Sequence, residues 1–179
     1  MTQPAPPRLY WEDFPVGTCL EFGGQTLTRE SIVEFAGRYD PQPFHLHDEA
    51  GGASLFGGLC ASGWHTCALT MRMLVDGYLK DSSSLGSPGI DELRWLKPVR
   101  PGDTIRVRMR VLQSRTMASR PGVGLSLQRW EVMNQNGETV MTMQGWGMYG
   151  LRGAGAGVGA GAGSGAGDAA SPPAGDGKR

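Results

Sequence analysis

The feature that most constrains the fold is an apolar segment at residues 64–78, WHTCALTMRMLVDGY. Its apolar side chains recur at helical spacing, at Trp64, Cys67, Ala68, Met71, Leu74, Val75 and Tyr78. Leu69 and Met73 widen this face, and a helix that is apolar over so wide an arc is usually buried on several sides. The pattern therefore predicts a central helix, with Ser62 as its N-cap.

The segments around this helix carry the patterns of antiparallel strands. Within residues 104–115, the apolar Ile105, Val107, Met109 and Val111 alternate with Arg106, Arg108 and Arg110. This alternation predicts a strand with one buried face. Further strands are expected at residues 19–27 and 91–99, and residues 125–150 have the pattern of a hairpin that turns at Asn136–Gly137.

Two other segments complete the predicted layout. Thr28 and the apolar stripe that follows it predict an N-capped helix over residues 29–39, which ends before Pro41. Residues 80–89, KDSSSLGSPG, are polar and rich in turn formers, so we expect a surface loop there. The simplest packing of these elements wraps one antiparallel sheet around the long helix, which is an α+β fold.

The charge balance and the cysteine content indicate which cellular compartment and which binding partners to expect. Seventeen Lys and Arg balance seventeen Asp and Glu, so the net charge is zero and favours neither nucleic acid nor an anionic membrane. Three cysteines without a CxxC motif argue against a disulfide framework and fit a reducing compartment. No segment resembles a signal peptide or a membrane span, so a cytoplasmic protein is expected.

The length suits a single domain with tails. Residues 1–7 are rich in proline, and residues 151–179 consist largely of glycine and alanine. Residues 151–179 cannot bury enough apolar area to offset the entropy lost on ordering. Residues 1–7 are a proline-rich terminal segment, a type that is commonly poorly ordered. We therefore predict one folded domain over residues 8–150 between two disordered tails.

A carboxylate and an imidazole lie close together before the central helix. Asp40 and His45 are separated by the four residues PQPF. The two prolines fix φ and remove two backbone donors, which predicts a rigid loop rather than regular helix or central strand. An acid and an imidazole held near each other are what general acid–base chemistry needs.

Plainer roles for these residues stay open. Asp40 could end the preceding helix or form a turn, and His45 could be a loop histidine with satisfied hydrogen bonds. His45, His47 and Asp48 have a spacing that could hold a metal ion. A nucleophile pair of Ser62 with a histidine three residues later is a further alternative, although no elbow motif surrounds the serine.

Two larger groups of residues also allow more than one role. The three arginines of residues 104–115 could form a solvated strand face or hold the phosphates of coenzyme A. The tryptophans downstream of the central helix could pack in the core or in an interface. They are Trp95, Trp130 and Trp146.

Residues 35–66, FAGRYDPQPFHLHDEAGGASLFGGLCASGWHT, resemble the hydratase motif of the MaoC-like dehydratase family, which includes the (R)-specific enoyl-CoA hydratases. Residues 93–105, LRWLKPVRPGDTI, resemble the strand–turn segment of the same family, and the resemblance covers roughly residues 10–150. It implies a hot-dog fold, in which a curved antiparallel sheet wraps a central helix. It also implies a homodimer, with the active site at or near the subunit interface.

The resemblance also assigns roles to particular residues. Asp40 and His45 match the catalytic acid–base pair of the family, and Gly63 matches the backbone donor that holds the thioester carbonyl. The sequence departs from the family pattern at two positions. Gln42 stands where an asparagine is common, and Met71 stands where some hydratases have an assisting serine.

The resemblance implies a hydratase/dehydratase of acyl-CoA or related acyl thioesters, which needs neither a cofactor nor a metal. It adds water across a 2-enoyl thioester or catalyses the reverse reaction. One alternative is an acyl-CoA thioesterase on the same fold, in which a carboxylate activates water against the carbonyl carbon. The other is a non-catalytic acyl-thioester binding protein, which the departures at Gln42 and Met71 make plausible.

Overall fold

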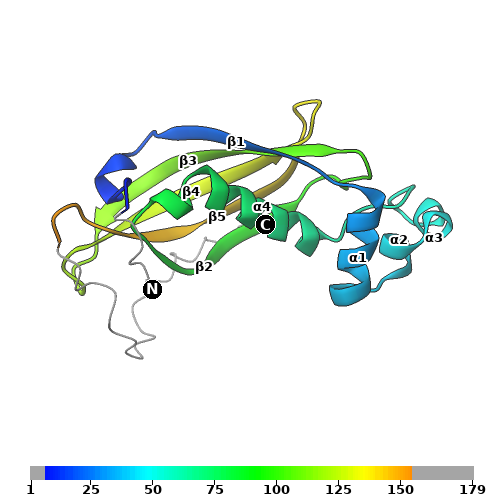
Figure 1. The fold of residues 1–179 in the computed structure, drawn as a ribbon, viewed down its shortest axis with the longest axis horizontal. Helices are drawn as coiled ribbons and strands as arrows, with labels where there is room; N and C mark the ends of the chain where they lie inside the picture. The colour runs from blue at the N-terminus through cyan, green and yellow to red at the C-terminus, as the bar shows by residue number, and fades with distance from the viewer. Residues whose placement is uncertain (1–6, 155–179) are drawn as a thin grey trace, which may run out of the picture.

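The computed structural model describes residues 7–154, which form one antiparallel sheet around a long helix (Figure 1). The sheet has the order β1-β3-β4-β5-β2, with β1 at Cys19–Thr26, β2 at Ser84–Trp95, β3 at Thr104–Thr116, β4 at Val123–Met133 and β5 at Thr139–Gly150. The helix α4 (Gly63–Gly77) lies in the curve of the sheet, and its N-cap is Ser62, as predicted. The predicted α+β architecture is confirmed.

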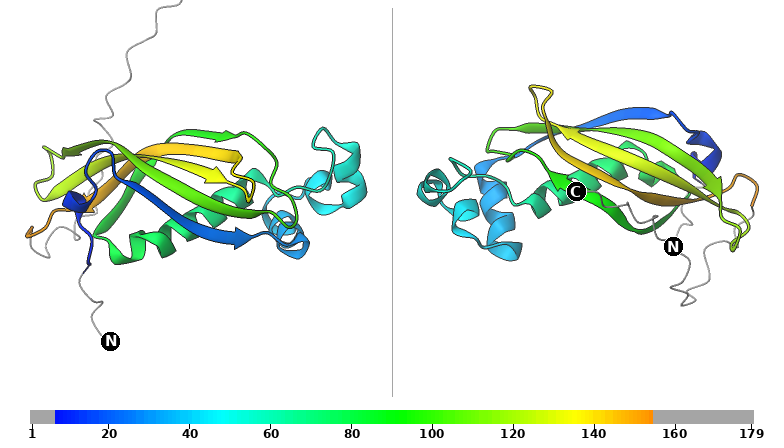
Figure 2. Two further views of the ribbon diagram at one scale, coloured as in Figure 1. Left: turned by 90° about the horizontal axis from the view of Figure 1, so that it is seen from above. Right: turned by 180° about the vertical axis from the view of Figure 1, so that it is seen from behind.

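The other helices gather at one end of the sheet, beside the N-terminus of α4 (Figures 1 and 2). They are α1 (Arg29–Tyr39), α2 (Pro43–Leu46) and α3 (Asp48–Ala53). The described residues also form two 3-10 turns outside this group, η1 (Trp11–Asp13) and η2 (Leu79–Asp81). The helix α1 begins as predicted, because Thr28 Oγ1 accepts a hydrogen bond from the Ser31 backbone N–H at 3.1 Å. This end of the molecule carries the Asp40–His45 segment.

The hydrophobic core lies between α4 and the inner face of the sheet. The apolar positions of the predicted alternation on β3 are all buried, namely Ile105, Val107, Met109 and Val111. Burial of each such side chain contributes about 1.5–3 kcal/mol to folding. The intervening arginines lie on the outer face, where Arg108 forms an ion pair with Glu21 at 2.6 Å.

The strand β2 begins earlier than the sequence predicts. Ser84 already pairs with Tyr149 of β5, inside the segment 80–89 that was expected to be a surface loop. Its Gly, Ser and Pro residues are poor strand formers, so the pairing partner β5, rather than local propensity, determines the conformation. The register shifts near Gly86 and Gly89 are the irregularities that such a sequence allows.

The prediction that two prolines exclude helix between Asp40 and His45 was wrong for Pro43. The short helix α2 begins at this proline. Proline is tolerated at the first helical position, because the N–H that it lacks would have no helical partner there.

The buried face of α4 also differs from the predicted one. Thr66 and Thr70 are buried, whereas Trp64 is 59% exposed and Met71 is 49% exposed. Thr70 donates its hydroxyl to the Thr66 carbonyl at 2.8 Å, so it can be buried without an unsatisfied donor. The apolar side of the helix that the sequence places in the core is therefore partly on the surface.

The predicted tails, residues 1–7 and 151–179, lie mostly outside the described residues 7–154. Near the end of this range, Arg152 forms an ion pair with Asp13 and stacks over the ring of Tyr10. None of the helices between residues 7 and 154 combines the length and the hydropathy needed to cross a bilayer. The cytoplasmic location stays a prediction.

Candidate active site

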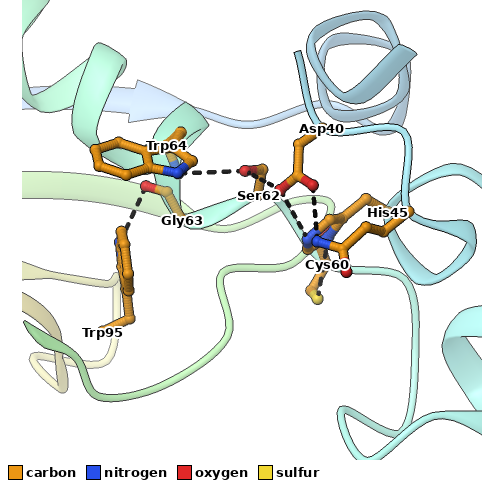
Figure 3. Close-up of polar contacts among 8 residues, drawn as sticks. Asp40, His45, Cys60, Ser62, Gly63, Trp64 and Trp95 are labelled. Carbon is orange, nitrogen blue, oxygen red and sulfur yellow. Dashed lines mark hydrogen bonds and ion pairs between the residues drawn. The ribbon is translucent and has the colours of Figure 1, made fainter. Parts of the chain in front are cut away.

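Three helices bring the predicted site residues together at the N-terminus of α4 (Figure 3). Asp40 is the C-cap of α1, His45 lies in α2, and Gly63 is the first residue of α4. His45 Nε2 lies 3.5 Å from Asp40 Oδ2. The carboxylate, the imidazole and the helix start are therefore neighbours in space.

A backbone carbonyl fixes the orientation of the His45 ring. The ring is buried, and its Nδ1 lies 2.7 Å from the Cys60 carbonyl oxygen. A carbonyl can only accept a hydrogen bond, so Nδ1 carries a hydrogen and Nε2 of the neutral ring keeps its lone pair. The Cys60 thiol lies 3.7 Å from Nδ1, and burial raises its pKa, so this neighbour is uncharged. The ring thus presents a proton acceptor toward Asp40.

Hydrogen bonds hold both carboxylate oxygens of Asp40. Gln42 Nε2 donates to Oδ1 at 2.7 Å, and Ser62 Oγ donates to Oδ2 at 2.6 Å. Burial by itself raises the pKa of Asp40, but the hydrogen bonds from Ser62 and Gln42 and the proximity of His45 outweigh it and lower that pKa. The Asp40 backbone N–H closes α1 on the Ala36 carbonyl, while the side chain turns toward Ser62 and His45.

The start of α4 offers a hydrogen-bond donor. Gly63 is the first helical residue, so its N–H has no acceptor within the helix, and the helix dipole adds positive potential there. Trp95 covers the glycine: its Nε1 donates to the Gly63 carbonyl at 3.0 Å. A Cβ at position 63 would lie 2.4 Å from Cε2 of the indole, so only glycine fits beneath it without movement.

These groups line a cleft of about 400 Å³. Its polar lining includes Asp40, His45, Ser62 and Gly63, together with Gln42, Thr66 and Lys97. Its apolar walls include Phe44, Phe56, Trp64, Trp95 and Val99. A mostly apolar cleft with a few convergent polar groups is typical of a small-molecule site. Met71, one of the two departures from the family pattern, is not among the lining residues.

The alternative roles find less support in the geometry. Between residues 7 and 154, no three His, Cys, Asp or Glu side chains group closely enough to hold a metal ion, and Asp48 pairs with Arg29 at 2.5 Å. The Ser62 hydroxyl contacts Asp40 rather than His65. The His65 ring stacks instead on Phe35, with 4.6 Å between the ring centroids.

Sequence reasoning missed two residues of the site, Ser62 as a partner of the carboxylate and Trp95 as a cover of the helix start. The sequence pattern predicts an N-cap at Ser62 and leaves a nucleophile pair with His65 as an alternative, and it predicts a core or an interface position for Trp95. Their partners lie 22 and 32 residues away in the chain, so no local pattern reveals these hydrogen bonds.

Comparisons with known proteins show which family the chain belongs to. The model of the MaoC like domain matches residues 14–127. The crystal structure of a MaoC-like dehydratase from Rhodospirillum rubrum is 40% identical, with a TM-score of 0.76 over 80% of this chain and 98% of that one. Protein MaoC from Klebsiella aerogenes is 31% identical over 105 residues, which is 58% of this chain but only 31% of that protein.

The similarity to a second, more distant structure concerns the fold only. The R-hydratase PhaJ1 from Pseudomonas aeruginosa is 21% identical, with a TM-score of 0.65 over 80% of this chain and 87% of that one. The hot-dog fold that the sequence resemblance implies is confirmed by these structural similarities. Since the family model spans more than half of the chain, the chain belongs to the MaoC-like domain family.

Proposed function

We propose that the chain is an acyl-thioester hydratase/dehydratase, with acyl-CoA as the expected substrate class. The observation that carries this proposal is the pair of His45 Nε2 and Asp40 Oδ2, 3.5 Å apart, beside the first N–H of α4. Such a site can polarise a carbonyl and move a proton within the same cleft. The 40% identity to the Rhodospirillum protein, which is named a dehydratase, supports the same reaction class.

The helix start is the proposed binding point for the thioester carbonyl. The Gly63 N–H donates a hydrogen bond to the carbonyl oxygen, and the positive end of α4 stabilises the enolate that develops during the reaction. Withdrawal of electrons through the conjugated double bond makes C3 electrophilic. The glycine allows the ligand to approach the backbone closely.

The Asp40–His45 pair is the proposed proton carrier. His45 Nε2 accepts a proton from water, whose oxygen forms the bond to C3, and the Asp40 carboxylate stabilises the imidazolium. The pair then delivers one proton to C2, so that the net addition is one water molecule. Dehydration of a 3-hydroxyacyl thioester uses the same groups in reverse order.

We further propose that the protein is a homodimer joined along β2. In the described sheet β2 is an edge strand, and Ile90 on it is 50% exposed. Trp64 and Met71 extend the exposed apolar surface onto α4. A second copy that pairs with this edge would cover both features and remove an open strand edge.

Hydration of crotonyl-CoA, followed by the loss of the enoyl absorbance, tests the proposed reaction. A parallel reaction with a thiol reagent distinguishes the alternatives, because only a thioesterase releases free coenzyme A. We expect loss of absorbance without thiol release. Thiol release instead would assign the chain to the thioesterases. No reaction with crotonyl-CoA or with longer and branched enoyl thioesters would favour a binding protein.

A further inference from the structure

The Ser62 hydroxyl makes two hydrogen bonds in a fully buried position. It accepts the Trp64 backbone N–H at 3.2 Å, as an N-cap does, and it lies 2.6 Å from Asp40 Oδ2. A hydroxyl has a single hydrogen, and an ionised carboxylate can only accept, so this hydrogen points at Asp40. Figure 3 shows the serine between the helix start and the carboxylate.

The first peptide of α4 is held at both of its polar ends. Ser62 binds its N–H, which belongs to Trp64, and the indole of Trp95 binds its carbonyl, which belongs to Gly63. The proposed carbonyl donor, the Gly63 N–H, belongs to the adjacent peptide. Ser62 therefore links the Asp40 carboxylate to the peptide that follows the proposed donor.

We propose that Ser62 is a positioning residue for the hydratase reaction, which ties the Asp40 carboxylate to the helix start that carries Gly63. This inference rests on the proposed function. The hydroxyl binds Oδ2, the same carboxylate oxygen that faces His45 Nε2. An N-cap that served the helix alone would need no such partner.

Two consequences follow for the carboxylate. Its rotation about the Cβ–Cγ bond is fixed, because Gln42 holds Oδ1 while Ser62 holds Oδ2. Its anionic form is favoured, because a hydrogen bond from a buried hydroxyl stabilises charge that burial would otherwise penalise. Without the Ser62 hydroxyl, Oδ2 loses a donor and the pKa of Asp40 rises.

The kinetic test compares Ser62→Ala with Thr28→Ala. Thr28 is a matched control, because it caps α1 through the same kind of hydrogen bond to a backbone N–H and does not contact Asp40. We expect Ser62→Ala to lower kcat by about tenfold to a hundredfold, with KM within about threefold of the wild type. The acid limb of its pH profile moves to higher pH. Equal losses in both variants would reduce Ser62 to a helix cap and overturn the proposal.

A second measurement does not depend on turnover. The side-chain carboxyl of Asp40 is titrated by carbon-13 NMR, with its signal assigned from Asp40→Asn. We expect this carboxyl to titrate at higher pH in Ser62→Ala than in the wild type, and at the wild-type pH in Thr28→Ala. An unchanged titration in Ser62→Ala would overturn the proposal.

The two measurements separate the inference from the function beneath it. If the wild type hydrates no enoyl thioester, the proposed function fails, while the Asp40 titration still decides whether Ser62 controls the carboxylate. If Ser62→Ala does not fold, Ser62→Cys replaces it in both experiments, because the thiol keeps the approximate volume and is only a weak donor.

Discussion

At the scale of single residues, the proposal depends on an ionised carboxylate and a histidine with a fixed tautomer. Asp40→Asn removes the charge that stabilises an imidazolium, and His45→Ala removes the proton acceptor. We expect each variant to lose about a hundredfold or more in kcat. Circular dichroism and the melting temperature should show an intact fold. Near-normal turnover in either variant would contradict the assigned roles.

His65 is a second buried histidine, outside the proposed chemistry, and it should make folding sensitive to acid. Its Nδ1 has no hydrogen-bond partner among the described residues, and burial lowers its pKa from the ordinary 6.5. Below about pH 6.5 the unfolded chain takes up a proton at His65, whereas the folded chain does so only at a lower pH. The free energy of unfolding therefore falls as the pH decreases toward the folded-state pKa. Above about pH 6.5 the residue is neutral in both states, and His65 no longer makes stability depend on pH.

His65→Phe should reduce this pH dependence, because phenylalanine keeps the stacking on Phe35 without a titrating group. Urea unfolding at about pH 7.5 and about pH 5.5 measures the loss of free energy on acidification for each protein. We expect a smaller loss in His65→Phe than in the wild type. His47→Ala, at an exposed histidine, is the control. A loss as large in His65→Phe as in the wild type would contradict the prediction.

At the scale of elements, the contact between α4 and β2 should matter for activity. In Gly63→Ala the new Cβ meets the Trp95 ring at 2.4 Å, so the indole or the helix start must move. The higher helix propensity of alanine, about 1 kcal/mol, partly offsets the cost in stability. We expect a loss of kcat/KM of about tenfold or more, because the carbonyl donor is displaced.

The other end of α4 provides the matched control. A Cβ on Gly77 meets the Phe22 ring at 2.6 Å, a similar clash between helix and strand. Phe22 is not among the residues of the cleft. Gly77→Ala should therefore lower the melting temperature without a specific loss of kcat/KM per folded molecule. Equal kinetic effects at both ends would show that position 63 acts only through the stability of the helix.

The sequence predicts those elements whose pattern is local. The alternation on β3 and the N-caps Thr28 and Ser62 are visible within a few residues, and the structure has them. The start of β2 is not visible, because Ser84 and its neighbours become a strand only by pairing with β5. The buried face of α4 was also mispredicted, since hydropathy cannot show that Thr70 satisfies its hydroxyl on its own helix.

The candidate site divides in the same way. Asp40, His45 and Gly63 could be proposed from a short motif, and the structure brings them together. Ser62 and Trp95 take part through hydrogen bonds that close only after α1, α4 and β2 have packed. A sequence pattern can therefore propose the reacting groups before it can show what holds them in place.

At the scale of the whole molecule, the proposed dimer explains why apolar side chains remain at the surface. Burial of Ile90 and Trp64 in an interface would recover the hydrophobic free energy that their exposure in a single chain forgoes. The wild type should therefore have twice the chain mass of 19.1 kDa by light scattering coupled to size exclusion. A monomer at micromolar concentration would contradict the proposal.

Ile90→Lys tests whether β2 is the strand that joins the copies. A lysine on an edge strand opposes pairing with a second, identical edge, because the two charges meet across the interface or must be desolvated. We expect this variant to shift toward the mass of one chain. Val16→Lys replaces another exposed apolar residue, which lies outside β2 and α4, and should keep the wild-type mass. If Val16→Lys dissociates and Ile90→Lys does not, the interface lies on a different face of the molecule. The open edge of β2 is then protected from pairing by its irregular register rather than by a second copy.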